Sequence, residues 1–118
     1  MLVITNNCMV EEHCYNRKIT IIKVETLMEV LIKGRDLVHK NYNLLNHPLC
    51  TSIKPYPNLY KTILLEEGER VDFASVNLIE NAIGVAKKFA EREMVALSND
   101  VLKDYQLIDY GVFLETIK

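Results

Sequence analysis

The sequence is short of the residues and runs that mark several classes of protein. It contains no tryptophan and only three cysteines, three prolines and four glycines among its 118 residues. Three cysteines are an odd number without framework spacing, which excludes the disulfide scaffold of a small secreted protein. No apolar run approaches the roughly 20 residues that cross a bilayer, and no basic, apolar leader opens the chain. We therefore expect a cytoplasmic protein without a membrane partner.

Neither sign of charge is in excess. Lys and Arg number 14 against 16 Asp and Glu, which gives a formal net charge of −2. Since nucleic-acid-binding proteins carry a basic face, no nucleic-acid partner is expected. The 49% apolar and 25% charged residues are typical of globular proteins, and the length fits a single domain over residues 1–118. A core of this size is also compatible with a homodimer that buries a further face.

Hydrophobic patterning predicts alternating strands and helices. Strands are expected at 2–4, 19–24 and 61–65, and helices at 9–16, 26–40 and 73–94, with one or two helical turns after Ser98 that break near Gly111. This alternation predicts a small α/β domain: a mostly parallel sheet of at least three strands with helices packed on its faces. Ligands of such folds bind beyond the carboxyl ends of the strands.

Three local signals fix the predicted helices more closely. Thr26 and Glu29 have capping-box spacing, and Asp72 is a typical residue to begin the long third helix. Gly34 lies on the apolar stripe of the second helix, where the absence of a side chain permits close packing on the sheet.

The turn Thr5-Asn6-Asn7 ends the first strand with one hydroxyl and two amides. These groups donate and accept hydrogen bonds, so they can hold a small polar ligand at the strand end. They can equally cap the next helix, since Asn and Thr side chains often bond to nearby backbone. The residues alone leave both interpretations open.

A second polar segment lies in the long connection 41–60, which contains all three prolines. A connection of this length without regular structure is uncommon in a compact domain and is often functional. Hydroxyl and cationic side chains that suit phosphate or carboxylate follow one another here, at His47, Thr51, Ser52 and Lys54. The alternative is a packed loop, made rigid by Pro48 and Pro55, in which Ser52 bonds to its own backbone.

Cysteine and histidine chemistry receives little support from the spacing. Cys50 lies three residues after His47, a pair that could form a thiol nucleophile and base, but free cysteine is more often a small buried residue. A zinc site would have to join distant segments without a paired Cys-x-x-Cys unit, so no metal is expected. No catalytic residue and no cofactor is specified by the sequence.

Two motifs carry a family resemblance. Leu-Val-Ile-Thr-Asn-Asn at 2–7 resembles the N-terminal motif of the GrdX family, and the stretch from His47-Pro48-Leu49 to Ser52-Ile53-Lys54-Pro55 resembles its central motif. Segments 30–40 and 72–89 are also similar to that family. The resemblance implies an association with the glycine, sarcosine and betaine reductase genes of anaerobic, amino-acid-fermenting bacteria, and it names no reaction. The positions it marks for testing are Thr5, Asn6, Asn7, Arg35, Asp36, His39, His47, Ser52 and Lys54.

The sequence departs from that pattern at its cysteines. The family leads us to expect proline at position 8 and small residues near 50 and 51, where this chain has Cys8, Cys50 and Thr51. The departure counts further against a thiol mechanism.

The leading hypothesis is therefore an accessory protein of the reductase system that binds a small ligand, such as an anionic metabolite, or a reductase component. A rival is an enzyme that acts on a small carboxylate or phosphorylated metabolite, with His47 as general acid or base and Lys54 and Arg35 holding the anion. The rival requires the 41–60 connection to return to the Thr5–Asn7 turn, whereas a parallel fold would bring the chain back at the opposite edge of the sheet. In a third possibility the loop packs against a second copy of the chain.

Overall fold

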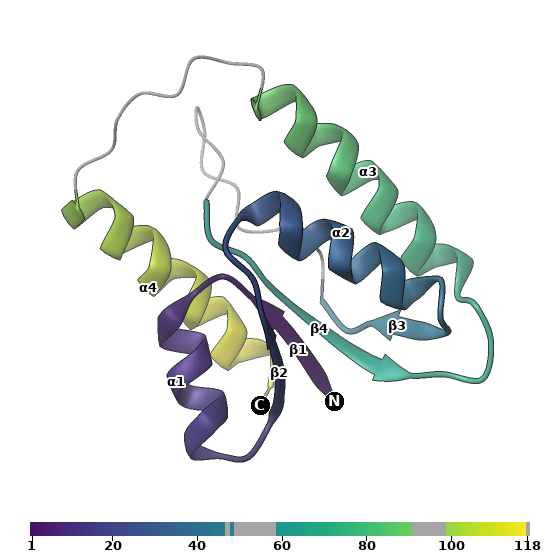
Figure 1. Cartoon of the computed structure of the whole chain (residues 1–118), viewed down its shortest axis with the longest axis horizontal. Helices are drawn as coiled ribbons and strands as arrows, with labels where there is room; N and C mark the ends of the chain where they lie inside the picture. Colours follow the sequence, from purple (N-terminus) through teal and green to yellow (C-terminus); the bar gives the residue numbers. More distant parts are fainter. Residues whose placement is uncertain (47, 49–58, 91–98, 118) are drawn as a thin grey trace.

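Four strands and four helices follow one another along the part of the chain that the structure, a computed structural model, describes (Figure 1). That part comprises residues 1–46, 48, 59–90 and 99–117. The elements are β1 (Leu2–Thr5), α1 (Cys8–Asn16), β2 (Thr20–Lys23), α2 (Leu27–Val38), β3 (Tyr42–Leu44), β4 (Thr62–Glu67), α3 (Phe73–Ala90) and α4 (Asn99–Thr116).

The strands form one sheet in the order β2-β1-β4-β3. Only β1 and β2 run parallel, with Val3 opposite Ile21, whereas β4 runs antiparallel to both β1 and β3. The α/β class is confirmed, but the prediction of a mostly parallel sheet was wrong. The cause is β3, a three-residue strand that the prediction included in the 41–60 connection.

The missed strand reverses the direction of the strand that follows it. Helix α2 carries the chain from β2 to β3, which has the same direction as β1, because both strands are antiparallel to β4. The chain then turns back and inserts β4 between β1 and β3. An antiparallel neighbour needs no crossover helix, so a loop suffices between β3 and β4.

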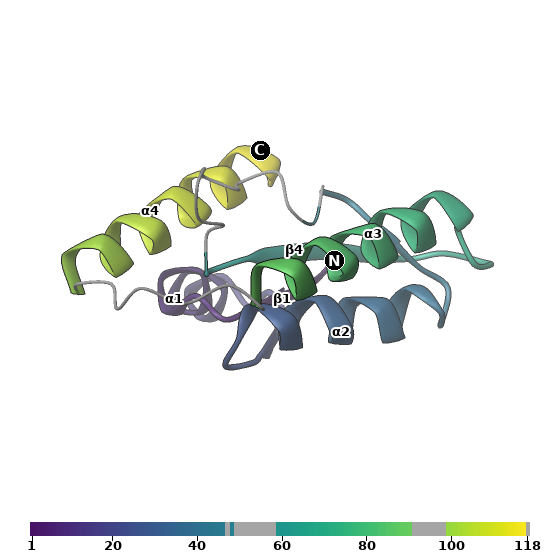
Figure 2. The same cartoon turned by 90° about the horizontal axis from the view of Figure 1, so that it is seen from above.

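Helices cover both faces of the sheet and produce three layers. On one face Ile4, Ile63 and Leu65 pack against α2 and α3, which lie side by side (Figure 1). On the other face Val3 and Leu64 pack against α1 and α4. Figure 2 shows α4 and α2 on opposite sides of β4. Since successive strand residues point to opposite faces, a strand buried on both faces shows a continuous apolar run, as the pattern at 2–4 indicated.

The local signals at the helix starts are confirmed. Thr26 Oγ1 accepts the backbone N–H of Glu29 at 3.2 Å, and Asp72 Oδ2 accepts the N–H of Ser75 at 3.3 Å. Gly34 lies against the sheet as predicted, since a Cβ there would come within 3.3 Å of Ile63 Cδ1. Each signal is local in the sequence, and its geometry does not depend on the direction of the strands.

The predicted end of the chain was wrong. Helix α4 continues through Gly111, where a Cβ would meet nothing within 4 Å, so the glycine neither breaks the helix nor permits a close contact. The expected end of the third helix near Met94 and the cap at Ser98 lie outside the described residues. Among the helices formed by the described residues, none has both the length and the apolar character needed to cross a bilayer.

Candidate functional site

The Thr5–Asn7 turn lies where β1 ends and α1 begins. Asn7 is the N-cap of α1, and its Oδ1 accepts the N–H of Met9 at 3.1 Å. Its Nδ2 donates to the backbone oxygen of Gln106 on α4 at 2.8 Å. The Asn7 side chain therefore joins the first strand, the first helix and the last helix, and its polar atoms are engaged within the protein.

Asn6 binds the segment that leads into β4. Its Nδ2 donates to the backbone oxygen of Leu59 at 2.8 Å, and its Oδ1 accepts the N–H of Lys61 at 2.9 Å. The two contacts reproduce with a side chain the pairing that a backbone strand would make. Asn6 thus extends the β1–β4 ladder beyond the end of β1.

Asn46 does the same from the other side of β4. Its Nδ2 donates to the backbone oxygen of Thr62 at 2.8 Å, and its Oδ1 accepts the N–H of Leu64 at 3.0 Å. Two asparagine side chains consequently hold the chain where it enters β4: Asn6, beyond the end of β1, binds the residues just before the strand, and Asn46, beyond the end of β3, binds its first residues. We call Asn6 and Asn46 the asparagine pair.

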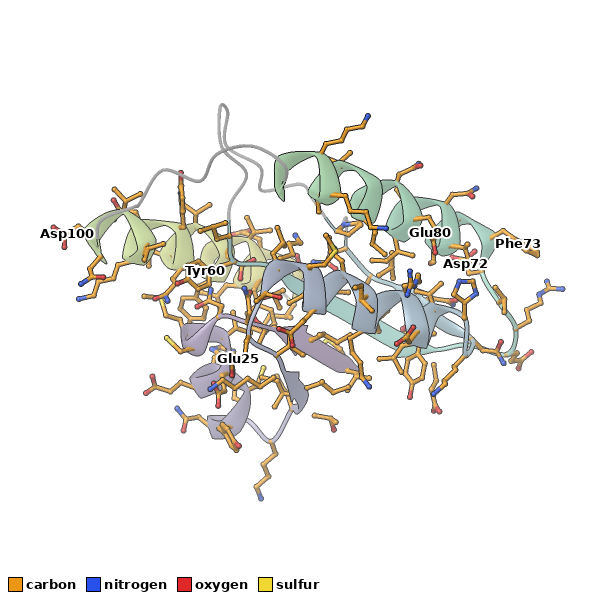
Figure 3. All side chains as sticks on the ribbon, turned by 45° about the horizontal axis from the view of Figure 1, so that its top comes forward. Glu25, Tyr60, Asp72, Phe73, Glu80 and Asp100 are labelled. Carbon is orange, nitrogen blue, oxygen red and sulfur yellow. The ribbon has the colours of Figure 1, made fainter. Side chains whose placement is uncertain are left out.

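The asparagine pair fixes both ends of the connection between β3 and β4, which we call the polar connection. Both ends lie at the edge of the sheet where β1 stops and α1 begins. Thr62 begins β4 opposite Thr5, and β3, which ends at Leu44 opposite Leu65, runs toward this edge, so that Asn46 reaches the backbone of Thr62. Tyr60 lies at this edge, next to the start of β4 (Figure 3). The antiparallel β4 thereby removes the topological objection to the rival hypothesis, because the connection leaves from the edge of the Thr5–Asn7 turn and returns to it.

A buried carboxylate on α4 lies beneath this edge and accepts hydrogen bonds from it. Asp109 is only 1% exposed, and it accepts hydrogen bonds from Asn7 Nδ2 at 3.0 Å, from Thr62 N at 3.1 Å and from Thr62 Oγ1 at 2.7 Å. Because the Thr62 hydroxyl proton is used there, Thr5 Oγ1 donates to Thr62 Oγ1, at 2.8 Å. Thr5 Oγ1 in turn accepts the N–H of Asn7 at 3.0 Å. We call Thr5, Asn7, Thr62 and Asp109 the buried network.

The buried network and a buried lysine are features that sequence reasoning missed. Asp109 occurs on the apolar stripe of its helix, four residues before the buried Phe113, and a carboxylate at such a position is a usable signal of an internal acceptor. Lys61, the first residue of the third predicted strand, is only 1% exposed. Buried cations are paired or hydrogen-bonded in folded proteins, so Lys61 adds a charged group to this edge.

The remaining predicted residues divide into two groups. Arg35 lies in the last turn of α2, eight residues or about 12 Å along the helix from its start after β2, and contacts Asp36 at 3.9 Å on the surface. It is not brought beside the Thr5–Asn7 turn. His47, Cys50, Thr51, Ser52 and Lys54 lie outside the described residues, so their contribution stays a prediction.

The cysteines that the structure describes differ in environment. Cys14 is buried, and burial raises the pKa of its thiol, which favours the protonated, unreactive form. Cys8 is exposed, with Sγ 3.9 Å from Gln106 Oε1. Within the described ranges, no three His, Cys, Asp or Glu side chains come together in a way that could hold a metal ion.

Comparison with known proteins identifies a matching family. A family model described as GrdX-like protein matches residues 2–118. No curated protein and no solved structure matches the chain. The match spans both polar motifs and continues through α4, which supplies Asp109.

Proposed function

Because the chain belongs to the GrdX-like protein family, we propose that it is an accessory protein of the glycine, sarcosine and betaine reductase system. In this proposal the protein binds a small polar ligand or a reductase component at the sheet edge that carries the Thr5–Asn7 turn. The observation that supports the proposal most is the asparagine pair, which holds both flanks of the polar connection at that edge.

The two motifs have different tasks in this proposal. The side chains of Thr5, Asn6 and Asn7 are engaged in internal hydrogen bonds, so their task is to hold the edge in shape. Recognition then belongs to the second motif, where His47 and Lys54 supply a hydrogen-bonding ring and a point charge for an anionic group. Turn variants should therefore reduce stability, and variants of His47 or Lys54 should reduce binding alone.

A thermal-shift screen of the reduced protein tests the ligand arm. The panel contains glycine, sarcosine, betaine, acetyl phosphate, phosphate and common nucleotides. A ligand at about 100 times its dissociation constant adds roughly 2.7 kcal/mol of stability, which raises Tm by several degrees in a domain of this size. We expect Lys54→Ala to abolish the shift, and Lys87→Ala, an exposed lysine of α3, to preserve it.

Capture of purified reductase components tests the partner arm. Wild-type protein and the Lys87→Ala control should retain a component that His47→Ala and Lys54→Ala release. The proposal is refuted if no ligand in the panel shifts Tm and both motif variants still capture the reductase component. Neither ligand binding nor partner binding would then depend on the second motif.

The return of the polar connection to the Thr5–Asn7 turn also favours the enzyme as a second candidate. His47 would act as general acid or base on a small carboxylate or phosphorylated metabolite, and Lys54 would hold its anionic group. Arg35, on the far turn of α2, is left out of this version. Consumption of a ligand found in the screen, lost in His47→Ala but retained in Lys87→Ala, would distinguish catalysis from binding.

A further inference from the structure

A second candidate site lies on the helical face of the molecule, away from the asparagine pair. A surface hollow of about 520 Å³ opens between α1 and α4, within the size range of small-ligand sites. Apolar, aromatic, amide and charged side chains line it: Met9, Glu12, His13, Asn16, Arg17, Tyr110 and Leu114. None of these residues belongs to the buried network.

His13 is the most buried residue that lines the hollow. It is 9% exposed, with Nδ1 3.1 Å from the Tyr110 hydroxyl and 3.4 Å from Arg17 Nη1. Since a guanidinium only donates, Nδ1 is the acceptor and the proton resides on Nε2. Burial, with the Arg17 charge adding to it, lowers the pKa of His13 and favours this neutral form.

The geometry leaves one polar group of this wall unsatisfied. Nε2 of His13 is buried and has no hydrogen-bond partner in the described part of the chain. A buried donor without an acceptor carries a desolvation cost, so each such group calls for an explanation. His13 lines the hollow, so this unsatisfied group belongs to a residue of the candidate site.

Two opposite charges line the same hollow without neutralising each other. Among the ion pairs between described residues, none joins Glu12 to Arg17, and the neighbouring Glu11 is the carboxylate that pairs with Lys23. With His13 neutral, the lining has one negative and one positive side chain and no net charge. A simple anion would meet Glu12 and a simple cation would meet Arg17, whereas a molecule with both charges satisfies the two.

We propose that this hollow binds a small zwitterion of the amino-acid class with an apolar side chain. Arg17 has N–H groups beyond the one at His13, and it holds the ligand carboxylate. Glu12 accepts from the ligand ammonium group, and Met9 and Leu114 contact the apolar part. The site is separate from the edge in the proposed function, so either can fail without the other.

An NMR titration with L-leucine and two derivatives tests the proposal. N-acetyl-L-leucine lacks the ammonium charge and L-leucinamide lacks the carboxylate, so each removes one of the two interactions. We expect leucine at up to about 10 mM to cause saturable shifts confined to the amides of α1 and α4, with both derivatives about tenfold weaker. No saturable binding of leucine, or equal binding of either derivative, would overturn the proposal.

Charge-neutral variants locate the site. Glu12→Gln and Arg17→Gln change exposed side chains, and each should weaken leucine binding about tenfold. Glu69→Gln and Arg70→Gln make the same changes in the exposed turn after β4 and should leave the affinity unchanged. Equal affinities in all four variants would place leucine elsewhere and refute the assignment.

Discussion

The replacement Asp109→Asn removes one charge and almost no volume from the buried network. In the wild-type protein the two carboxylate oxygens of Asp109 accept three hydrogen bonds, two at Oδ2 and one at Oδ1. An amide nitrogen at Oδ2 would face the Asn7 amide group, and one at Oδ1 would face the N–H of Thr62. Either orientation of the new side chain therefore opposes a donor to a buried donor.

The expected cost follows from these contacts. One buried N–H loses its acceptor, which costs about 1–3 kcal/mol, and the two remaining bonds lose their charge assistance at about 1 kcal/mol each. The variant no longer buries a charge, which offsets part of that sum. We expect a net loss of about 2–3 kcal/mol in the free energy of unfolding, or roughly 10 °C in Tm.

Urea unfolding followed by far-UV circular dichroism measures this loss, since the chain has no tryptophan to report by fluorescence. Asp104→Asn makes the same substitution on an exposed position of α4 and should change stability by less than about 0.5 kcal/mol. A double-mutant cycle with Thr62→Val should give a coupling energy above about 0.5 kcal/mol. If Asp109→Asn costs no more than Asp104→Asn, the reasoning about the buried network is refuted.

Three further predictions concern other parts of the molecule. Asn6→Ala should cost about 1–2 kcal/mol and accelerate hydrogen exchange at the Lys61 amide, and unchanged exchange there would contradict the asparagine pair. The pKa of His13 is lower in the folded protein than its ordinary value of 6.5. As the pH falls below 6.5, the unfolded chain therefore protonates this histidine before the folded protein does, and the folded protein loses stability. His13→Gln should therefore show a smaller loss of stability between pH 7 and pH 5 than wild type, and an equal loss would count against it. Gly84→Ala should raise stability by up to about 1 kcal/mol in thermal unfolding, because nothing lies within 4 Å of the added Cβ; a loss would point to an unrecognised contact.

Sequence patterns predicted the parts of this fold that depend on near neighbours. The cap at Thr26, the start of α3 at Asp72 and the contact of Gly34 with the sheet all follow from residues a few positions apart. The family resemblance is also confirmed, because the family model covers residues 2–118.

The direction of β4 could not be predicted in the same way. The centre of β4, Ile63 to Leu65, is a continuous apolar run that is buried on both faces. Such a run looks the same in either direction, so periodicity does not indicate the orientation of the strand. The deciding element was β3, whose three residues include Asn43, a residue type that is depleted in strands. The candidate site depended on this direction, since it brings Asn46 and Thr62 to the edge of Thr5.

Asp109 illustrates a different limit. A carboxylate on a helix is usually solvated, and its partners Asn7 and Thr62 are 102 and 47 residues away in the sequence. The sequence marked Asn7 correctly as a helix cap among its alternatives, since Asn7 accepts the N–H of Met9. The Nδ2 group of the same side chain donates to Gln106 and Asp109. These two hydrogen bonds could be predicted only with knowledge of where α4 packs.

The long sequence separation between Asp109 and its partners affects how the protein folds during synthesis. Asn7 and Thr62 leave the ribosome long before their common acceptor, so a nascent chain must keep the Asn7 amide and the Thr62 N–H in water until α4 emerges. The β1–β4 face that bears Val3 and Leu64 also lacks its cover from Phe113 until then. Although N-terminal parts of proteins generally fold first during synthesis, this face of the sheet can be covered only after α4 has been translated. Its half-built form exposes an apolar strand pair to chaperones and to other nascent chains.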